Sequence, residues 1–226
     1  MEYVLKEWLG LGPVALLVLA VAGFFVYWKL KENHVRRSVQ ETEDMILRMA
    51  EAGDSVACFR MGRKYQNGEG VDQDSVVADE WFQKALPGLR READEGYEAA
   101  AACLYECYHE GIVVGSDQAQ ALHWLKMAAE LGDVECQLAL ALEYRTGGLV
   151  EKDSARFIHW LHLAADGVEG SVQYMMGGDA QYLLGACYEY GEGVPQDLEK
   201  AREWYRKAED NLADGAEEAL KRLGGK

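Results

Sequence analysis

Few residues in this chain combine the types and spacings that chemistry requires. His159 and His162 are three residues apart on a predicted helix and could share a metal ion, but the sequence offers no obvious third ligand. Two Gly-Glu-Gly triplets, at residues 68–70 and 191–193, resemble fragments of phosphate-binding loops, yet no predicted strand precedes them and no Gly-Lys-Ser/Thr follows them. No serine, cysteine or lysine lies in a motif that would supply a base and an oxyanion site. We therefore expect no enzyme, no metal site and no cofactor.

The glycine triplets are better explained as turns of a helix-turn-helix unit, which is most complete between Gly178 and Lys207. In this stretch Ala180, Leu184 and Tyr188 recur every four residues and share one face of a helix. The triplet then supplies positive φ angles that end the helix, and Asp197 can cap the next one. The apolar stripe of the second helix consists of Ala201, Trp204 and Ala208. We expect the tryptophan to be the large residue at the centre of the contact between the two helices.

The same unit occurs four times along the chain. When the tyrosine of each unit is taken as offset zero, a tryptophan follows at offset +16 and a small residue precedes it at −8. The four pairs are Tyr65 and Trp81, Tyr108 and Trp124, Tyr144 and Trp160, and Tyr188 and Trp204. The second glycine of the turn is replaced by Val113 in the second unit and by Leu149 in the third. This recurrence predicts an array of four similar helix pairs.

These residues resemble the Sel-one-like repeat, a relative of the tetratricopeptide repeat. Alanine, leucine-glycine, tyrosine, Gly-x-Gly-Val, aspartate, alanine, tryptophan and lysine-alanine follow one another as they do in that family. The resemblance covers about residues 50–223 and implies an all-α fold, an α/α solenoid whose usual role is to hold other proteins. It identifies no particular partner.

The repeats and their flanks predict the domain organisation. We expect an N-terminal membrane helix with a short leader, a basic segment with a capping helix, four repeats, and a C-terminal capping helix with a tail. Their ranges are 1–30, 31–52, 53–214 and 215–226, and the repeats lie at about 53–95, 96–131, 132–175 and 176–214. The first and third repeats are longer than the second. In the first, residues 89–95 can extend the second helix beyond a break or kink at Pro87, and in the third, the glycine-rich residues 167–178 should form a loop.

Residues 9–28 contain no charged side chain and predict one transmembrane helix. Trp8 and the pair Tyr27-Trp28 lie at its ends, where interfacial aromatic residues are expected. The segment 29–37 is basic, so we expect the amino terminus outside and the repeats on the cytoplasmic side of a bacterial inner membrane. A cleaved signal peptide is the alternative, because Ala20-Val21-Ala22 has the small-x-small form. Against cleavage, the apolar run continues beyond this site and the leader is not basic.

Composition argues against two further classes of protein. The chain has 23 basic and 39 acidic side chains, and removing the five basic and three acidic ones of residues 1–37 leaves 18 and 36 in the rest. A net charge of −18 in residues 38–226 makes nucleic acid an improbable ligand. The five cysteines form no pair that recurs from repeat to repeat, unlike those of a secreted, disulfide-stabilised solenoid.

A partner-binding surface is predicted on the first helix of each repeat. At about 100° per residue, offsets −8, −4 and 0 face the second helix, so offsets −5 and −2 face away and line one side of the array, commonly the concave side. These residues are Arg60, Arg63, Cys103, Glu106, Ala139, Leu142, Leu183 and Ala186. Apolar side chains bounded by basic ones would suit an amphipathic or acidic peptide. The alternative is that Leu142 and Leu183 only pack between adjacent repeats.

Two functions are consistent with these features. The first is a membrane-anchored scaffold or adaptor that binds another protein beside the membrane, without a small-molecule substrate. The second is an immunity or inhibitor protein that sequesters a toxin or a secreted effector. Neighbouring genes would separate them, since a toxin gene favours the second and an envelope or secretion operon favours the first.

Overall fold

The structure is a computed structural model that describes residues 29, 42–167 and 174–224. Contacts divide the chain into two units, Met1–Met49 and Ala50–Lys226. The predicted transmembrane span, residues 9–28, lies outside the described residues. Among the residues that are described, no helix is both long enough and apolar enough to cross a bilayer.

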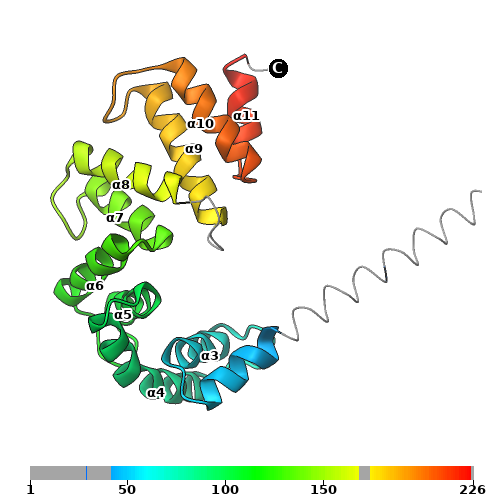
Figure 1. Cartoon of the computed structure of the whole chain (residues 1–226), viewed down its shortest axis with the longest axis vertical. Coiled ribbons are helices and arrows are strands. Elements are labelled where there is room, and N and C mark those ends of the chain that lie inside the picture. Colours follow the sequence, from blue (N-terminus) through cyan, green and yellow to red (C-terminus); the bar gives the residue numbers. More distant parts are fainter. Residues whose placement is uncertain (1–28, 30–41, 168–173, 225–226) are drawn as a thin grey trace, which may run out of the picture. The chain divides into compact units, whose positions relative to one another are not determined.

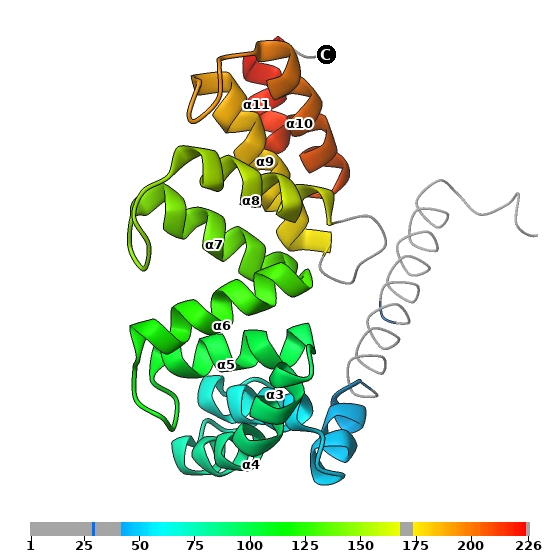
Figure 2. The same cartoon turned by 60° about the vertical axis from the view of Figure 1, so that its left-hand side comes forward.

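The unit Ala50–Lys226 contains four helix pairs followed by a short helix. The pairs are α3 (Ser55–Asn67) and α4 (Ser75–Asp94), α5 (Glu98–Glu110) and α6 (Gln118–Leu131), α7 (Val134–Thr146) and α8 (Ser154–Asp166), α9 (Tyr174–Tyr190) and α10 (Leu198–Asp210), and α11 (Ala216–Arg222) follows them. The two helices of each pair pack against each other, and the second helix of a pair packs against the first helix of the next, so the pairs stack in chain order (Figures 1 and 2). Residues 42–51 are also helical. The predicted α/α solenoid is confirmed.

In every helix pair, an aspartate at the start of the second helix is hydrogen-bonded to both helices. In the first pair, Asp74 Oδ1 accepts hydrogen bonds from the backbone amides of Val76 and Val77 at 2.9 and 3.1 Å. The backbone amide of Asp74 donates to the carbonyl of Tyr65, at 3.0 Å. The same two-sided arrangement joins Asp117 to Tyr108, Asp153 to Tyr144, and Asp197 to Tyr188. Each aspartate therefore caps the second helix and ties its start to the end of the first.

The centre of each pair is the residue after the repeat tryptophan, at offset +17. Phe82, Leu125, Leu161 and Tyr205 hold this position, and each has at most 3% of its surface exposed. Trp124 is buried as well, but Trp81, Trp160 and Trp204 are only half-buried. The expectation that the tryptophan is central in every repeat is therefore wrong by one residue. Offsets +16 and +17 both lie three or four residues from the buried residues at +13 and +20, so the spacing alone does not distinguish them.

The residue of the first helix that faces this central residue is matched to it in size. Gly62 faces the ring of Phe82, and Gly185 faces the ring of Tyr205. A Cβ atom on Gly185 would lie 2.6 Å from Tyr205 Cδ1, which is closer than van der Waals contact allows. The residues at offsets −3 and +17 are Gly62 and Phe82, Tyr105 and Leu125, Ala141 and Leu161, and Gly185 and Tyr205. The residue at offset +17 is thus aromatic where the first helix has glycine at offset −3. It is leucine where the first helix has a side chain at that offset.

The two longer repeats differ in how they accommodate their extra residues. In the first, α4 extends to Asp94 as predicted, and it continues through Pro87 without the break that the proline could have caused. In the third, residues 174–178 were expected in a loop but form the start of α9, while residues 168–173 lie outside the described part. A Cβ atom on Gly178 would lie 3.0 Å from the carbonyl oxygen of Asn211. This glycine therefore allows α9 to approach the turn after α10, which is a packing role inside a helix.

The short helix α11 is fixed to the last pair by a buried carboxylate. Glu189 Oε2 accepts hydrogen bonds from the Tyr205 hydroxyl and from Arg222 Nη2, both at 2.7 Å, and the carboxylate is almost fully buried. The Arg222 guanidinium holds the pKa of Glu189 below its ordinary value. Ala216 and Ala219 of α11 have no exposed surface. The last repeat is thus covered by apolar contacts and by one hydrogen-bonded ion pair.

We expect Gly185→Ala to destabilise the protein by about 1–3 kcal/mol, because the added methyl group must displace the buried ring of Tyr205. Urea denaturation of the full chain measures this loss. The control is Gly185→Ala with Tyr205→Leu, which reproduces the combination of Ala141 and Leu161 in the third repeat. The double variant should lose less stability than the sum of the two single variants. Strict additivity would show that the two positions are not in contact.

Candidate interaction surface

The predicted surface residues lie on α3, α5, α7 and α9, the first helices of the four pairs. Besides packing on its own partner, α3 contacts α5, and α7 contacts α9. The faces of these helices that point away from the second helices are therefore neighbours along the stack. We call the set of residues at offsets −5 and −2 the first-helix surface. It comprises Arg60, Arg63, Cys103, Glu106, Ala139, Leu142, Leu183 and Ala186.

In the first two repeats this surface is charged. Arg63 donates to Glu106 Oε2 through Nε at 3.0 Å and through Nη2, and it donates to both oxygens of Glu110 at 2.6 Å. Two residues that the sequence placed on the surface, Arg63 and Glu106, are thus in direct contact across a repeat boundary. Arg60 is exposed, whereas Cys103 has only 7% of its surface exposed and belongs to the core. Cys103 is therefore not available to a partner.

The charges in this cluster do not balance. Burial raises the pKa of Glu106 despite its bonds to Arg63, and the nearby carboxylate of Glu135 adds to this rise. The hydrogen bond from Arg63 lowers the pKa of Glu110. One guanidinium therefore serves two carboxylates, with a third close by. Of the two arginines predicted to bound the surface, Arg63 is bonded to carboxylates and Arg60 remains. The prediction that the surface binds an acidic peptide therefore loses its main support.

In the last two repeats the first-helix surface is apolar. Leu142 retains 36% of its exposure, and Ala139, Leu183 and Ala186 are half-buried. Each of these side chains has one part in a packing contact and another part in solvent. Leu142 occupies the same offset as Arg63, so the surface changes from charged to apolar along the stack. The two alternatives for the leucines, packing between repeats and contact with a partner, both agree with this partial burial.

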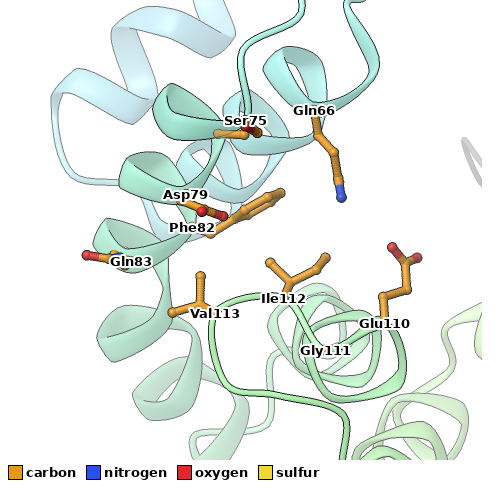
Figure 3. A pocket seen from close by; sticks show the side chains of 10 residues that line it. Gln66, Ser75, Asp79, Phe82, Gln83, Glu110, Gly111, Ile112 and Val113 are labelled. Carbon is orange, nitrogen blue, oxygen red and sulfur yellow. The ribbon is translucent and has the colours of Figure 1, made fainter.

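Sequence reasoning missed a hollow at the boundary between the first two repeats. It lies between α4 and the turn after α5 and has a volume of about 430 Å³. Phe82, Ile112 and Val113 form its apolar base, and Gln66, Asp79 and Glu110 are among the residues around it (Figure 3). The only signal in the sequence was the loss of the turn glycine at Val113. We call this cavity the repeat-boundary hollow.

A second hollow, of about 380 Å³, lies at the next boundary beside α6 and the start of α8. Its lining carries both signs of charge, with Glu151 and Asp153 beside Lys126, Lys152 and Arg156. Arg156 Nη1 donates to the Tyr144 hydroxyl at 3.1 Å, and Arg156 Nε lies 3.4 Å from Asp153 Oδ2. This hollow therefore presents no single sign of charge to a ligand.

The two histidines considered for metal binding each pack against a tryptophan. His162 contacts Trp204 edge-on, with 5.4 Å between ring centroids, and His159 contacts Trp160 in the same way. Burial lowers the pKa of His162. Across the described residues, no three histidine, cysteine or acidic side chains come together as a metal site. All five cysteines are buried thiols, and burial raises the pKa of both Cys107 and Cys187 to about 12, which disfavours the reactive thiolate.

Comparisons with known proteins agree with this architecture. A family model described as the Sel1 repeat matches residues 55–86, 97–133, 134–167 and 178–211. A Sel1 repeat protein from Oxalobacter formigenes is 31% identical over 81% of this chain and 49% of its own, with a TM-score of 0.59. A protective antigen with an SLR fold from uropathogenic Escherichia coli is 31% identical over 80% of this chain and 35% of its own, with a TM-score of 0.58. The chain thus spans half or less of each of these two proteins. No curated protein matches it.

We expect Arg63→Met to destabilise the protein by about 1–3 kcal/mol, because it leaves the partly buried Glu106 without its cation while keeping much of the side-chain volume. The matched control is Arg60→Met on the same helix, where the exposed arginine should contribute less than about 0.5 kcal/mol. Both changes are measured by urea denaturation at neutral pH. Equal losses in the two variants would contradict a specific role for the Arg63 cluster.

Proposed function

We propose, on the premise that the chain belongs to the Sel1 repeat family, that it recruits a partner protein through its first-helix surface beside a membrane that its N-terminal segment spans. Sel1 repeat proteins are scaffolds for protein–protein interaction, and a protein partner follows from that membership. The identity of the binding surface, the membrane anchor and the cytoplasmic position of the repeats are the further parts of the proposal.

The observation that carries the choice of surface is the group of partly exposed apolar side chains on α7 and α9. Leu142 is 36% exposed on the face that points away from α8, and in the next repeat Ala186 holds the same offset and Leu183 holds offset −5. Neighbouring apolar side chains that remain partly in water are typical of a protein contact surface. The Arg63 cluster adds charged groups to the same surface, which favour one orientation of a partner over others.

The sequence supports the membrane anchor. The uncharged run of residues 9–28 would span about 30 Å as a helix, which is the thickness of a hydrocarbon core. The basic segment 29–37 would lie at the anionic cytoplasmic leaflet, and the acidic repeats would be repelled from it. The anchor would thus hold the repeats near the membrane while their charge keeps the binding surface accessible.

The anchor is tested by fractionation. We expect full-length protein to remain in membranes after a carbonate or high-salt wash, and a version containing residues 38–226 to be recovered in the soluble fraction. Protease added to intact spheroplasts should leave the repeats uncut if they are cytoplasmic. Digestion from outside would contradict the orientation, and an amino terminus at Gly23 would favour the cleaved signal peptide instead.

The surface is tested by affinity capture with detergent-solubilised full-length protein. We expect the double substitution Leu142→Glu and Leu183→Glu to lose the captured partner, because two charges in the apolar area are costly to bury under another protein. Leu198→Glu, at an exposed leucine at the start of α10, is the matched control and should retain the partner. Circular dichroism must show that the double variant stays folded. Loss of the fold, or an intact fold that still binds, would exclude these leucines as the contact surface.

A further inference from the structure

The repeat-boundary hollow exists because the first repeat departs from the packing of the third. In the third repeat, offset +14 is Ile158, and a Cβ atom on Gly193 would lie 3.0 Å from Ile158 Cγ1. The turn of the fourth repeat therefore sits directly on this isoleucine. In the first repeat, offset +14 is Asp79, and the turn residue equivalent to Gly193 is Val113. An isoleucine therefore fills the boundary between the third and fourth repeats. The boundary between the first and second repeats has no such side chain and contains the hollow.

A carboxylate takes the place of the isoleucine at this position. Asp79 is exposed, and in the part of the chain that the structure describes no hydrogen bond or salt bridge to it occurs. Asp79 and Glu110 lie on two sides of the hollow, with Phe82 and the turn residues between them (Figure 3). Glu110 shares Arg63 with Glu106, so two carboxylates are bonded to one guanidinium. The residues that line the hollow include the two carboxylates of Asp79 and Glu110 but no lysine or arginine.

The turn that forms the other wall has an unusual backbone. Val113 has a φ of 63°, in the left-handed region where a β-branched side chain is strained. Gly70 and Gly193 hold the equivalent position in the first and fourth repeats, with φ of 70° and 72°. A glycine would therefore satisfy the turn, and the valine instead adds an apolar side chain to the hollow. Strain of this kind is concentrated at functional sites.

We propose that the repeat-boundary hollow receives one lysine or arginine side chain of the partner protein. The aliphatic stem of that side chain packs on Phe82, Ile112 and Val113, and its charged end lies between the carboxylates of Asp79 and Glu110. The volume of about 430 Å³ is within the range of pockets that hold small molecules, so one such side chain fits. This assignment specifies the partner of the scaffold and rests on the proposed function.

The hollow is tested with single-residue probes on the full-length protein. Methyl NMR spectra report on Ile112 and Val113 in the hollow and on Ile158 at the closed boundary. We expect N-acetyl-arginine amide and N-acetyl-lysine amide to shift the Ile112 and Val113 signals and to leave Ile158 unchanged. The neutral isostere N-acetyl-norleucine amide should bind more weakly, because it lacks the charge. Equal affinity for the neutral and the cationic probes would overturn the proposal.

Two substitutions of Asp79 complete the test. Asp79→Asn should weaken binding of the cationic probes by roughly two- to fivefold, the range expected for one partly exposed ion pair. Asp79→Ile reproduces the residue of the third repeat and should abolish binding by filling the hollow, without lowering the thermal midpoint. Unchanged affinity in both variants would exclude Asp79 as the recognition group.

The probes also separate this inference from the proposed function. If the cationic probes fail to bind but affinity capture still yields a partner that Leu142→Glu and Leu183→Glu release, the hollow assignment is wrong and the scaffold stands. If the probes bind as expected but no partner is captured, the hollow binds cations and the scaffold proposal fails. Release of a captured partner by Asp79→Ile, with the fold intact, supports both.

Discussion

The repeat array depends on one aspartate in each turn. Its carboxylate accepts the amides that begin the second helix, and its own amide donates to the carbonyl of the repeat tyrosine, at 2.9–3.0 Å in all four pairs. Because one residue is bonded to both helices, neither helix can slide along the other without breaking a hydrogen bond. The fixed register is what allows offset −3 to face offset +17, and the remaining packing follows from it.

The fold could be predicted because its determinants are local. Glycine, aspartate, tyrosine and alanine at fixed spacings specify where each helix begins, ends and faces. The central residue could not be identified, because Trp204 and Tyr205 both satisfy the helical spacing and only tertiary packing distinguishes them. The start of α9 was also missed, since Gly178 has the composition of a loop residue but serves as a close contact inside a helix.

The candidate surface could be predicted only in outline. Helical geometry identifies the offsets that face away from the second helix, and Leu142 and Arg63 lie at one of these offsets. The sequence could not show that Arg63 is shared by Glu106 and Glu110, because that contact crosses a repeat boundary and joins residues more than 40 positions apart. The repeat-boundary hollow was hidden for the same reason, since it requires Asp79 of one repeat to meet Val113 of the next.

The size match between the two helices of a pair limits how such a gene can be shuffled. If recombination in a turn joined α5 to the sequence of α4, Tyr105 would meet Phe82 where the first repeat has Gly62, and the two rings would compete for one space. If it joined α3 to the sequence of α8, Gly62 would meet Leu161 and leave a void. A crossover between pairs keeps every matched couple together. Duplication and loss of repeats in this lineage should therefore have breakpoints after the second helix. The helix pair is then the unit that is gained or lost.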